Sequence, residues 1–306
     1  MLEVEHLTKR FGTLTAVDDL SFTTRPGRVT GFLGPNGSGK TTTLRMALGL
    51  TTPTSGRATF DGVPYQRLKN PTRLVGAALE ASAFHPGRTA KDHVRMLADG
   101  AKIGKARCDQ VLEMVGLAAA ADRRVGGFSM GMRARLGLAA AMLGDPQVLL
   151  LDEPANGLDP EGIVWMRDLL RALADDGKSV LVSSHLLAEV QQSVDDVVII
   201  AHGRLVHTST LAGLAREHEN RTEVIAADPG AWGRLVAEQG WTVQPGEPSA
   251  GPPSAGQQAM VVVGPTAAQI GRTAFAAGVE LHQLATQRSG LEATFLALTE
   301  GQGTIR

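Results

Sequence analysis

The sequence of 306 residues is poor in cysteine, in aromatic side chains and in excess charge of either sign. Its single cysteine, Cys108, excludes an intrachain disulfide and is typical of a reducing compartment. The 30 basic and 31 acidic residues nearly cancel, so charge gives no indication of a nucleic-acid partner. An apolar fraction of 43% with 20% charged residues is that of a folded protein rather than a disordered one.

Long hydrophobic runs are also missing. No basic segment followed by an apolar stretch opens the chain, so we expect no signal peptide. The longest apolar stretches, such as DDVVIIA, fall far short of the roughly 20 residues that a membrane helix needs. We therefore expect a cytoplasmic protein that reaches a membrane only through a partner. With about 150 residues per domain as a guide, the length predicts two domains.

Residues 1–219 alternate short β-branched runs with helical segments. Four of the runs, RVTGFLG, QVLLLDE, KSVLVSSH and DDVVIIA, are almost continuously apolar. Such strands are typical of a mostly parallel sheet with helices on both faces, so we predict an α/β domain here. Residues 89–144 have helical patterns and few strand signals, which predicts a helical insertion within this domain.

Residues 220–306 differ in pattern and predict a small second domain. A strand, a helix and a strand precede the linker PGEPSAGPPSAGQQ, and a second strand, helix and strand follow it. This order predicts a ferredoxin-like α+β unit, with the Pro/Gly/Ser segment as a loop between its halves. SGLEATFLALTE predicts a closing helix.

The stretch GFLGPNGSGKTT lies between a predicted strand and a predicted helix. Gly34, Gly39, Lys40 and Thr41 have the spacing of a phosphate-binding loop. Glycines let backbone N–H groups turn toward a phosphate, Lys40 supplies a cation for the β- and γ-phosphates, and the Thr41 hydroxyl can bind Mg²⁺. A flexible glycine turn is the alternative, but the Lys-Thr pair in register favours a nucleoside triphosphate.

Two strands end in residues that suit phosphate chemistry. In QVLLLDEP, Asp152 can hold magnesium and Glu153 can orient or deprotonate a water molecule, although the pair could also simply cap the strand. His185 ends KSVLVSSH at the same edge of the sheet, where ligands of open α/β sheets bind, although a structural histidine is the alternative. Asp159 and Pro160 predict a helix start, and that role alone would account for them.

The segment VGGFSMGMRARLG raises the question whether it only begins a helix or forms half of an active site. Ser129 can cap the helix that follows. Met132 stands where a capping box would have Glu or Gln, so backbone N–H groups at this helix start are left for an anion. The sequence pattern supports both interpretations.

The order of these motifs resembles the ATPase subunits of ATP-binding cassette (ABC) transporters over roughly residues 1–220. The resemblance implies a P-loop NTPase fold with an N-terminal β-subdomain and a helical insertion. It implies that Asp152 binds magnesium, Glu153 is the catalytic base, Asp159 lies in the loop that crosses a dimer, and His185 contacts the γ-phosphate. Phe11 falls where the family stacks an aromatic ring on adenine, with a core phenylalanine as the alternative. The resemblance implies these nucleotide-binding positions: Phe11, Gly34, Pro35, Asn36, Gly37, Ser38, Gly39, Lys40, Thr41 and Thr42. It also implies a signature that contacts the ATP of a second copy, formed by Ser129, Met130, Gly131 and Met132.

Two departures from the family pattern point to a subgroup. Glu80 stands where the family usually has a glutamine, and the signature is Ser-Met-Gly-Met instead of Ser-Gly-Gly-Gln. Both features resemble bacterial ATPases of drug, antibiotic or lantibiotic export and self-resistance. The resemblance implies ATP and Mg²⁺ as cofactors, a second copy of the chain as a partner, and a membrane permease of about six spans. It also implies a permease-docking surface at residues 80–93 and a place on the inner face of the cell membrane.

Two rival functions remain open. One is an ABC-type ATPase that acts as a switch on ribosomes or DNA, although such proteins usually carry two cassettes or inserted arms. The other is a regulatory module that holds ATP without turnover, against which Glu153 and His185 both count. A neighbouring gene for a membrane protein would favour export.

Overall fold

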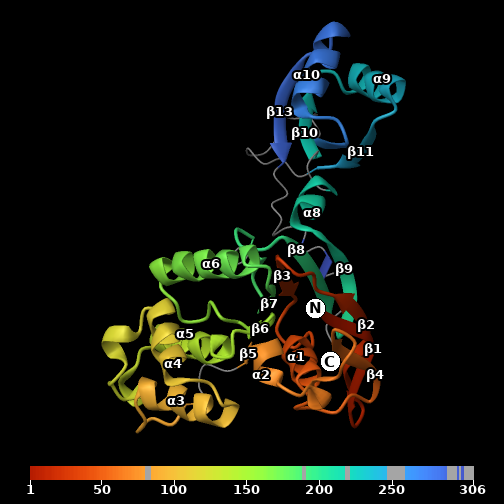
Figure 1. Ribbon diagram of the computed structural model, residues 1–306. Helices are drawn as coiled ribbons and strands as arrows, with labels where there is room; N and C mark the ends of the chain where they lie inside the picture. Colours follow the sequence, from red (N-terminus) through yellow and green to blue (C-terminus); the bar gives the residue numbers. More distant parts are fainter. Residues whose placement is uncertain are drawn as a thin grey trace. The chain divides into compact units, whose positions relative to one another are not determined.

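The computed structural model describes residues 1–79, 84–187, 191–217, 221–246, 259–287, 295, 298 and 299. By its internal contacts the chain forms two compact units, residues 1–211 with 295–306 and residues 212–294 (Figure 1). The domain boundary expected after residue 219 stays a prediction. Glu80, most of the linker and most of the expected closing helix lie outside the described residues.

An antiparallel three-stranded sheet opens the first unit. Its strand order is β2-β1-β4, with β1 at Leu2–Phe11, β2 at Leu14–Thr23 and β4 at Ser55–Phe60. Leu2, Leu7 and Leu20 are fully buried and belong to one apolar cluster with Leu150 and Leu181 of the main sheet. This cluster joins the predicted N-terminal β-subdomain to the rest of the unit.

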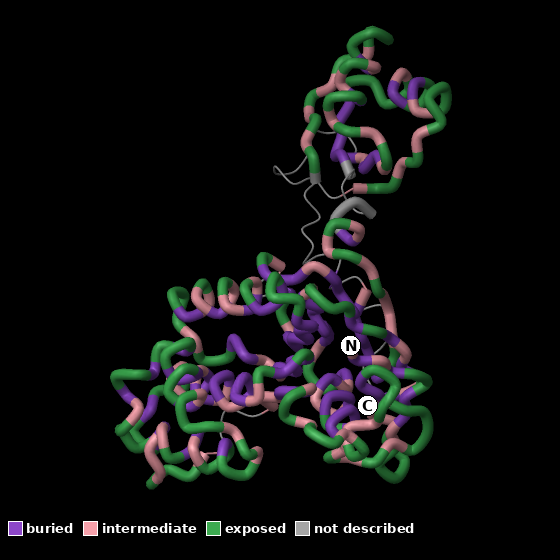
Figure 2. Tube along the Cα trace, viewed as in Figure 1, coloured by how far each residue is buried: buried purple, intermediate pink, exposed green. Residues whose placement is uncertain are grey.

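The main sheet has six strands in the order β5-β6-β7-β3-β8-β9. The strands are β3 (Arg28–Leu33), β5 (Val75–Ala78), β6 (Val148–Asp152), β7 (Ser179–Ser184), β8 (Asp196–Ala201) and β9 (Arg204–Thr210). All neighbouring pairs are parallel except β8 with β9, which confirms the mostly parallel sheet. Figure 2 shows buried positions along these strands, as expected for apolar runs covered on both faces. Parallel order brings their carboxyl ends to one edge.

Helices complete the first unit. Those of the main body are α1 (Lys40–Ala47), α2 (Pro71–Leu74) and α6 (Pro160–Asp175), with a short turn, η1, at Tyr65–Arg67. The helical insertion contains α3 (Ala90–Ala101), α4 (Lys105–Met114) and α5 (Met130–Met142), with the short turns η2 (Ala118–Ala120) and η3 (Val125–Gly127). These elements confirm the predicted insertion, whose interior is filled by apolar side chains such as Val94, Leu112 and Leu136.

The second unit has the predicted ferredoxin-like arrangement. Its elements are β10 (Arg221–Ala226), α9 (Pro229–Gln239), β11 (Thr242–Pro245), β12 (Met260–Val263), α10 (Ala267–Ala276) and β13 (Leu281–Gln287), and α8 (Leu211–Glu217) precedes them. The strand order is β11-β12-β10-β13, and all neighbours are antiparallel. Trp232 of α9 and Ile270 of α10 are fully buried on one face of this sheet.

A search of the described residues finds no helix that is long and apolar enough to cross a membrane.

Candidate nucleotide-binding site

The predicted phosphate loop is the turn between the end of β3 and the start of α1. A Cβ atom on Gly34 would lie 2.4 Å from the carbonyl oxygen of Ile200, and one on Gly39 would lie 2.5 Å from that of Ala16. Gly39 also has a left-handed backbone, with φ of 103°. Both positions therefore require glycine. In the described loop no side chain caps α1, so its first N–H groups remain available to an anion.

Lys40 turns back into this loop. Its ammonium group donates to the carbonyl oxygens of Gly34 at 2.6 Å and Pro35 at 3.3 Å, and it lies 3.5 Å from Oε1 of Glu153. The side chain is only 6% exposed, and burial lowers the pKa of Lys40 even though Glu153 opposes the shift. A buried cation at the end of the loop is well placed to attract the phosphates of a nucleotide.

The other residues of the loop differ in how far they are exposed to solvent. Asn36 and Gly37 are exposed, whereas Pro35, Thr41 and Thr42 are half-buried. The hydroxyl of Ser38 is buried and has no hydrogen-bond partner among the residues that the structure describes. A buried hydroxyl without a partner is costly, so an oxygen-rich ligand at this loop would relieve it. The loop residues therefore fit a phosphate group.

Thr41 and Asp152 meet at the carboxyl edge of the sheet. The Thr41 hydroxyl donates to Oδ2 of Asp152 at 2.7 Å. A hydroxyl beside a single carboxylate suits Mg²⁺, which usually combines one or two carboxylates with waters and substrate phosphates. Among the described residues no group of three or more His, Cys, Asp or Glu could hold a metal by itself.

Ser183 is a site residue that sequence reasoning missed. Its hydroxyl donates to Oδ1 of Asp152 at 2.5 Å and accepts from the backbone N–H of Glu153 at 2.9 Å. Ser183 is buried near the end of β7, the neighbour of β6, and so fixes both acidic residues. The signal was a serine near the end of a buried strand, but the strand order was needed to pair it with Asp152.

Glu153 and His185 are in direct contact. Nδ1 of His185 lies 2.9 Å from Oε2 of Glu153, and the two side chains are 30% and 19% exposed. Glu153 has a φ of 49°, an unfavourable backbone conformation for a residue with a side chain and one that often marks functional sites. The site thus brings Lys40, Glu153 and His185 into one chain of contacts.

Phe11 is not a core residue. It ends β1 beside the turn to β2 and is 51% exposed, with the ammonium group of Lys9 4.8 Å from the centre of its ring. The open ring excludes the alternative of a buried phenylalanine and leaves one face available for stacking.

The segment around Ser129 is a helix start, as predicted. The Ser129 hydroxyl accepts from the backbone N–H of Met132 at 3.2 Å, and α5 follows. Ser129 and Met130 are exposed, Met130 by 59%. Where the chain is described, no hydrogen bond or ion pair joins this helix start to the phosphate loop. The signature residues are therefore not part of the same intrachain cluster as Lys40.

The start of α5 packs on the loop that precedes α6. A Cβ atom on Gly157 would lie 2.6 Å from Cγ of Met130, and one on Gly131 would lie 3.3 Å from the carbonyl oxygen of Gly157. Asp159 ends that loop and caps α6, since its carboxylate accepts from the backbone N–H of Gly162 at 2.8 Å. The predicted capping role of Asp159 is confirmed.

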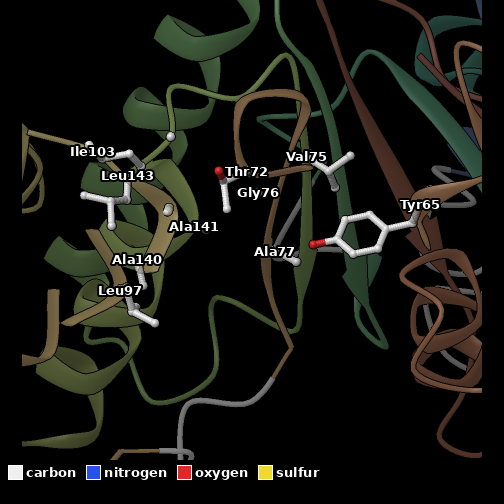
Figure 3. Close-up of a pocket in the computed structure, with 12 residues that line it drawn as sticks. Tyr65, Thr72, Val75, Gly76, Ala77, Leu97, Ile103, Ala140, Ala141 and Leu143 are labelled. Atoms are coloured by element: carbon white, nitrogen blue, oxygen red, sulfur yellow. The ribbon is translucent and has the colours of Figure 1, made fainter. Parts of the chain in front are cut away.

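A separate cavity of about 260 Å³ lies between β5 and the helical insertion (Figure 3). Tyr65, Thr72 and Gly76 line one side, and Leu97, Ile103 and residues of α5 line the other. The cavity contains none of the predicted nucleotide-binding residues, and it adjoins the amino end of β5 rather than the carboxyl edge that carries the site.

The chain is similar in sequence to known proteins. Residues 17–156 match the family model described as "ABC transporter", and residues 220–292 match "Domain of unknown function (DUF8746)". The chain is 40% identical over 231 residues to the bacitracin transport ATP-binding protein BcrA of Bacillus licheniformis, covering 74% of this chain and 76% of that protein. It is 32% identical over 206 residues to the lantibiotic transport ATP-binding protein SrtF of Streptococcus pyogenes, covering 67% and 89%.

One solved structure, an ATP-binding subunit of an ABC transporter, matches with a TM-score of 0.64 and 25% identity, covering 71% of this chain and 92% of that one. The match confirms the predicted P-loop fold. Taken with the two sequence relatives and the geometry of the phosphate loop, it confirms the resemblance found in the motifs. The chain belongs to the ABC transporter family, as an ATP-binding subunit that hydrolyses ATP.

Proposed function

We propose that this ATPase energises a separate membrane permease that exports an antibiotic, a drug or a peptide. One observation carries the proposal: contacts link Lys40 to Glu153 and Glu153 to His185, and the Thr41–Asp152 pair lies beside them. This arrangement combines phosphate binding with a base at one edge of the sheet. The names of the bacitracin and lantibiotic transport relatives support the class of cargo. The Ser-Met-Gly-Met signature supports the same subgroup.

The loop residues hold the nucleotide. Phe11 stacks on the adenine ring, and backbone N–H groups of Asn36–Thr42 surround the β-phosphate. Lys40 exchanges its contact with Glu153 for the β- and γ-phosphates. Thr41 and Asp152 would hold Mg²⁺, which would neutralise charge on the phosphate oxygens.

Hydrolysis depends on Glu153. Once Lys40 has turned to the phosphates, the Glu153 carboxylate is free to accept a proton from an attacking water molecule. His185 holds that carboxylate in position through Nδ1, at 2.9 Å, and contacts the γ-phosphate. Ser183 keeps Asp152 and the backbone of Glu153 in a fixed relation.

Two copies form the working unit. Each ATP lies between the phosphate loop of one copy and the Ser129–Met132 helix start of the other, and Asp159 lies in the loop that crosses between them. The exposure of Ser129 and Met130 and the absence of an intrachain contact with the phosphate loop in the described residues support this arrangement. ATP then favours the closed pair to the extent that it binds that state more tightly.

The permease docks on the surface of residues 80–93, and the chain is thereby held on the inner face of the cell membrane. Glu80 is part of this surface, where its carboxylate replaces the usual glutamine. Residues 1–219 act as the ATP-binding domain and residues 220–306 as an accessory domain for contact or regulation.

The test is membrane recruitment. The chain is expressed with and without the membrane protein of about six spans that we expect from a neighbouring gene, and the membrane fraction is assayed for the chain and for ATPase activity. Recruitment only with that partner, together with partner-dependent resistance to an exported antibiotic, supports the proposal. Equal amounts in the membrane fraction with and without the partner would overturn it. Lys40→Ala is the control, since it removes ATP binding without altering residues 80–93.

A further inference from the structure

The first residue of α5, Met130, lies against the loop that leads from β6 to α6. A Cβ atom on Gly157 of this loop would stand 2.6 Å from Cγ, 2.8 Å from Sδ and 2.9 Å from Cβ of Met130. Gly157 also has a left-handed backbone, with φ of 78°. The stem of Met130 therefore occupies the space that a side chain of residue 157 would need, although 59% of the methionine is exposed.

The loop, residues 153–159, contains two turns, and the first begins at the proposed base. The backbone N–H of Asn156 donates to the carbonyl oxygen of Glu153 at 3.1 Å, and that of Leu158 donates to the carbonyl oxygen of Ala155 at 3.1 Å. The contact with Met130 lies within the second turn. Because the two turns share residues 155 and 156, a contact that fixes the second turn also restricts the first.

Helix α5 also borders the first residues of the loop. A cavity of about 30 Å³ is lined by Ala134 and Gly137 of α5 and by Glu153 and Pro154 of the loop. The small side chains on this part of α5 allow the helix to approach the loop closely. The first residue of α5 is thus placed to hold the loop from the side of the helical insertion.

We propose that Met130 is a positioning residue for ATP hydrolysis, which holds residues 153–159 so that Glu153 keeps its place. Ser183 and His185 hold Glu153 from the main sheet, through its backbone N–H and its carboxylate. Met130 adds a contact from the helical insertion. The usual signature has a glycine at this position, which has no side chain to make the contact. The inference rests on the proposed role of Glu153.

Hydrogen exchange of the full chain without nucleotide tests the contact itself. Met130→Ala removes Cγ, Sδ and the terminal methyl group but keeps a good helix former at the start of α5. We expect the peptide that contains residues 153–159 to exchange about 5–30-fold faster, because burial of the methionine stem no longer opposes opening of the turns. Met130→Leu keeps an apolar Cγ and should exchange as slowly as the unaltered chain. Met132→Ala is the matched control, because Met132 belongs to the same signature but none of its atoms is among those nearest to Gly157.

Steady-state hydrolysis tests the positioning role. Met130→Ala should lower kcat by up to about 10²-fold, because a small misplacement of a reacting group is costly, and should leave KM for ATP unchanged. Met130→Leu should restore kcat. A direct contact of Met130 with ATP would instead raise KM and leave exchange in the loop unaltered. Unaltered exchange or an unchanged kcat with Met130→Ala, or an equal loss of kcat in both variants, would each overturn the proposal.

A failure of the proposed base gives a different result. Near-normal turnover of Glu153→Gln would refute the role of Glu153 in hydrolysis. Exchange of the loop without nucleotide does not depend on that role, so it still decides whether Met130 holds residues 153–159.

Discussion

The ammonium group of Lys40 lies 3.5 Å from Oε1 of Glu153, so the cation of the phosphate loop and the proposed catalytic base form an ion pair. The other oxygen of the same carboxylate contacts His185. We propose that phosphates reaching the loop offer Lys40 a second anion, and that the transfer of Lys40 to them leaves Glu153 free to act on water. In this proposal, binding and the release of the base are coupled through one contact.

Replacement of Glu153 by glutamine tests this coupling. Glu153→Gln should retain ATP binding while hydrolysis slows by about 10²–10⁴-fold, as for the loss of a general base. The ATP-bound pair of chains should accumulate because it is not hydrolysed. Single-turnover hydrolysis and sedimentation with ATP provide the measurements, and near-normal turnover would remove Glu153 from the proposed role.

The pKa of Lys40 makes ATP binding sensitive to alkaline pH. Burial lowers this pKa, whereas phosphates would raise it, so binding should take up a proton once the pH exceeds the lowered value. The affinity should then fall as the pH rises. Conversely, the free energy of unfolding without ATP should rise with pH in this range, because the unfolded chain binds the extra proton.

Titration calorimetry at alkaline pH in two buffers of different ionisation enthalpy measures this proton uptake. Lys40→Arg is the control, because a guanidinium stays charged and should show no uptake. Equal binding heats in both buffers with the natural lysine would contradict the prediction.

Ser129→Arg should separate ATP binding from turnover. The new side chain projects from the exposed start of α5 and blocks the second chain, so each monomer should still bind ATP while steady-state hydrolysis is lost. Loss of the cap should also cost about 1 kcal/mol of stability. Ser129→Ala loses the same cap without the added bulk and should keep turnover. Loss of ATP binding by the Ser129→Arg monomer would refute the two-chain site.

Asp196 should stabilise the fold down to acidic pH. Its carboxylate accepts two hydrogen bonds from Arg28, at 2.6 and 2.7 Å, and others from Arg25. Burial by itself raises the pKa of Asp196, but the two guanidinium groups lower it below the ordinary value. A lowered carboxyl pKa contributes stability above the unfolded pKa, and the contribution disappears as the pH falls through the folded one.

Asp196→Asn should therefore lower the free energy of unfolding by about 1–3 kcal/mol at neutral pH, toward the smaller value because Arg25 is more than half exposed. Denaturant unfolding at several pH values measures the effect. The difference from the unaltered chain should shrink below the ordinary aspartate pKa, and a constant difference down to the most acidic pH would be contrary to this account.

Glu80→Gln restores the residue that the family usually has, and we expect it to change coupled transport more than basal hydrolysis. The glutamine can donate an amide hydrogen bond and has no charge, whereas the glutamate only accepts. Transport and ATPase rates measured with the permease make the comparison. Unchanged coupling would mean that the carboxylate has no specific role.

The local motifs determined much of the molecule without any structure. Although the atoms that exclude a side chain at Gly34 and Gly39 belong to the distant Ile200 and Ala16, these two glycines and Lys40 predicted the loop because their spacing is that of a local strand-to-helix turn. Ser129 and Asp159 were predicted as caps for the same reason, and the structure places both there. The apolar runs predicted the parallel strands, since burial on both faces favours apolar side chains at most positions.

Only the tertiary structure decided which distant side chains meet. Ser183 bridges Asp152 to Glu153 because β7 lies beside β6, and an apolar pattern does not encode strand order. The guanidinium of Arg135 lies 4.0 Å from the centre of the Trp165 ring for a similar reason, since helix packing joins α5 to α6. Sequence spacing fixes contacts within a turn or a helix start, whereas contacts between elements follow from how the whole chain packs.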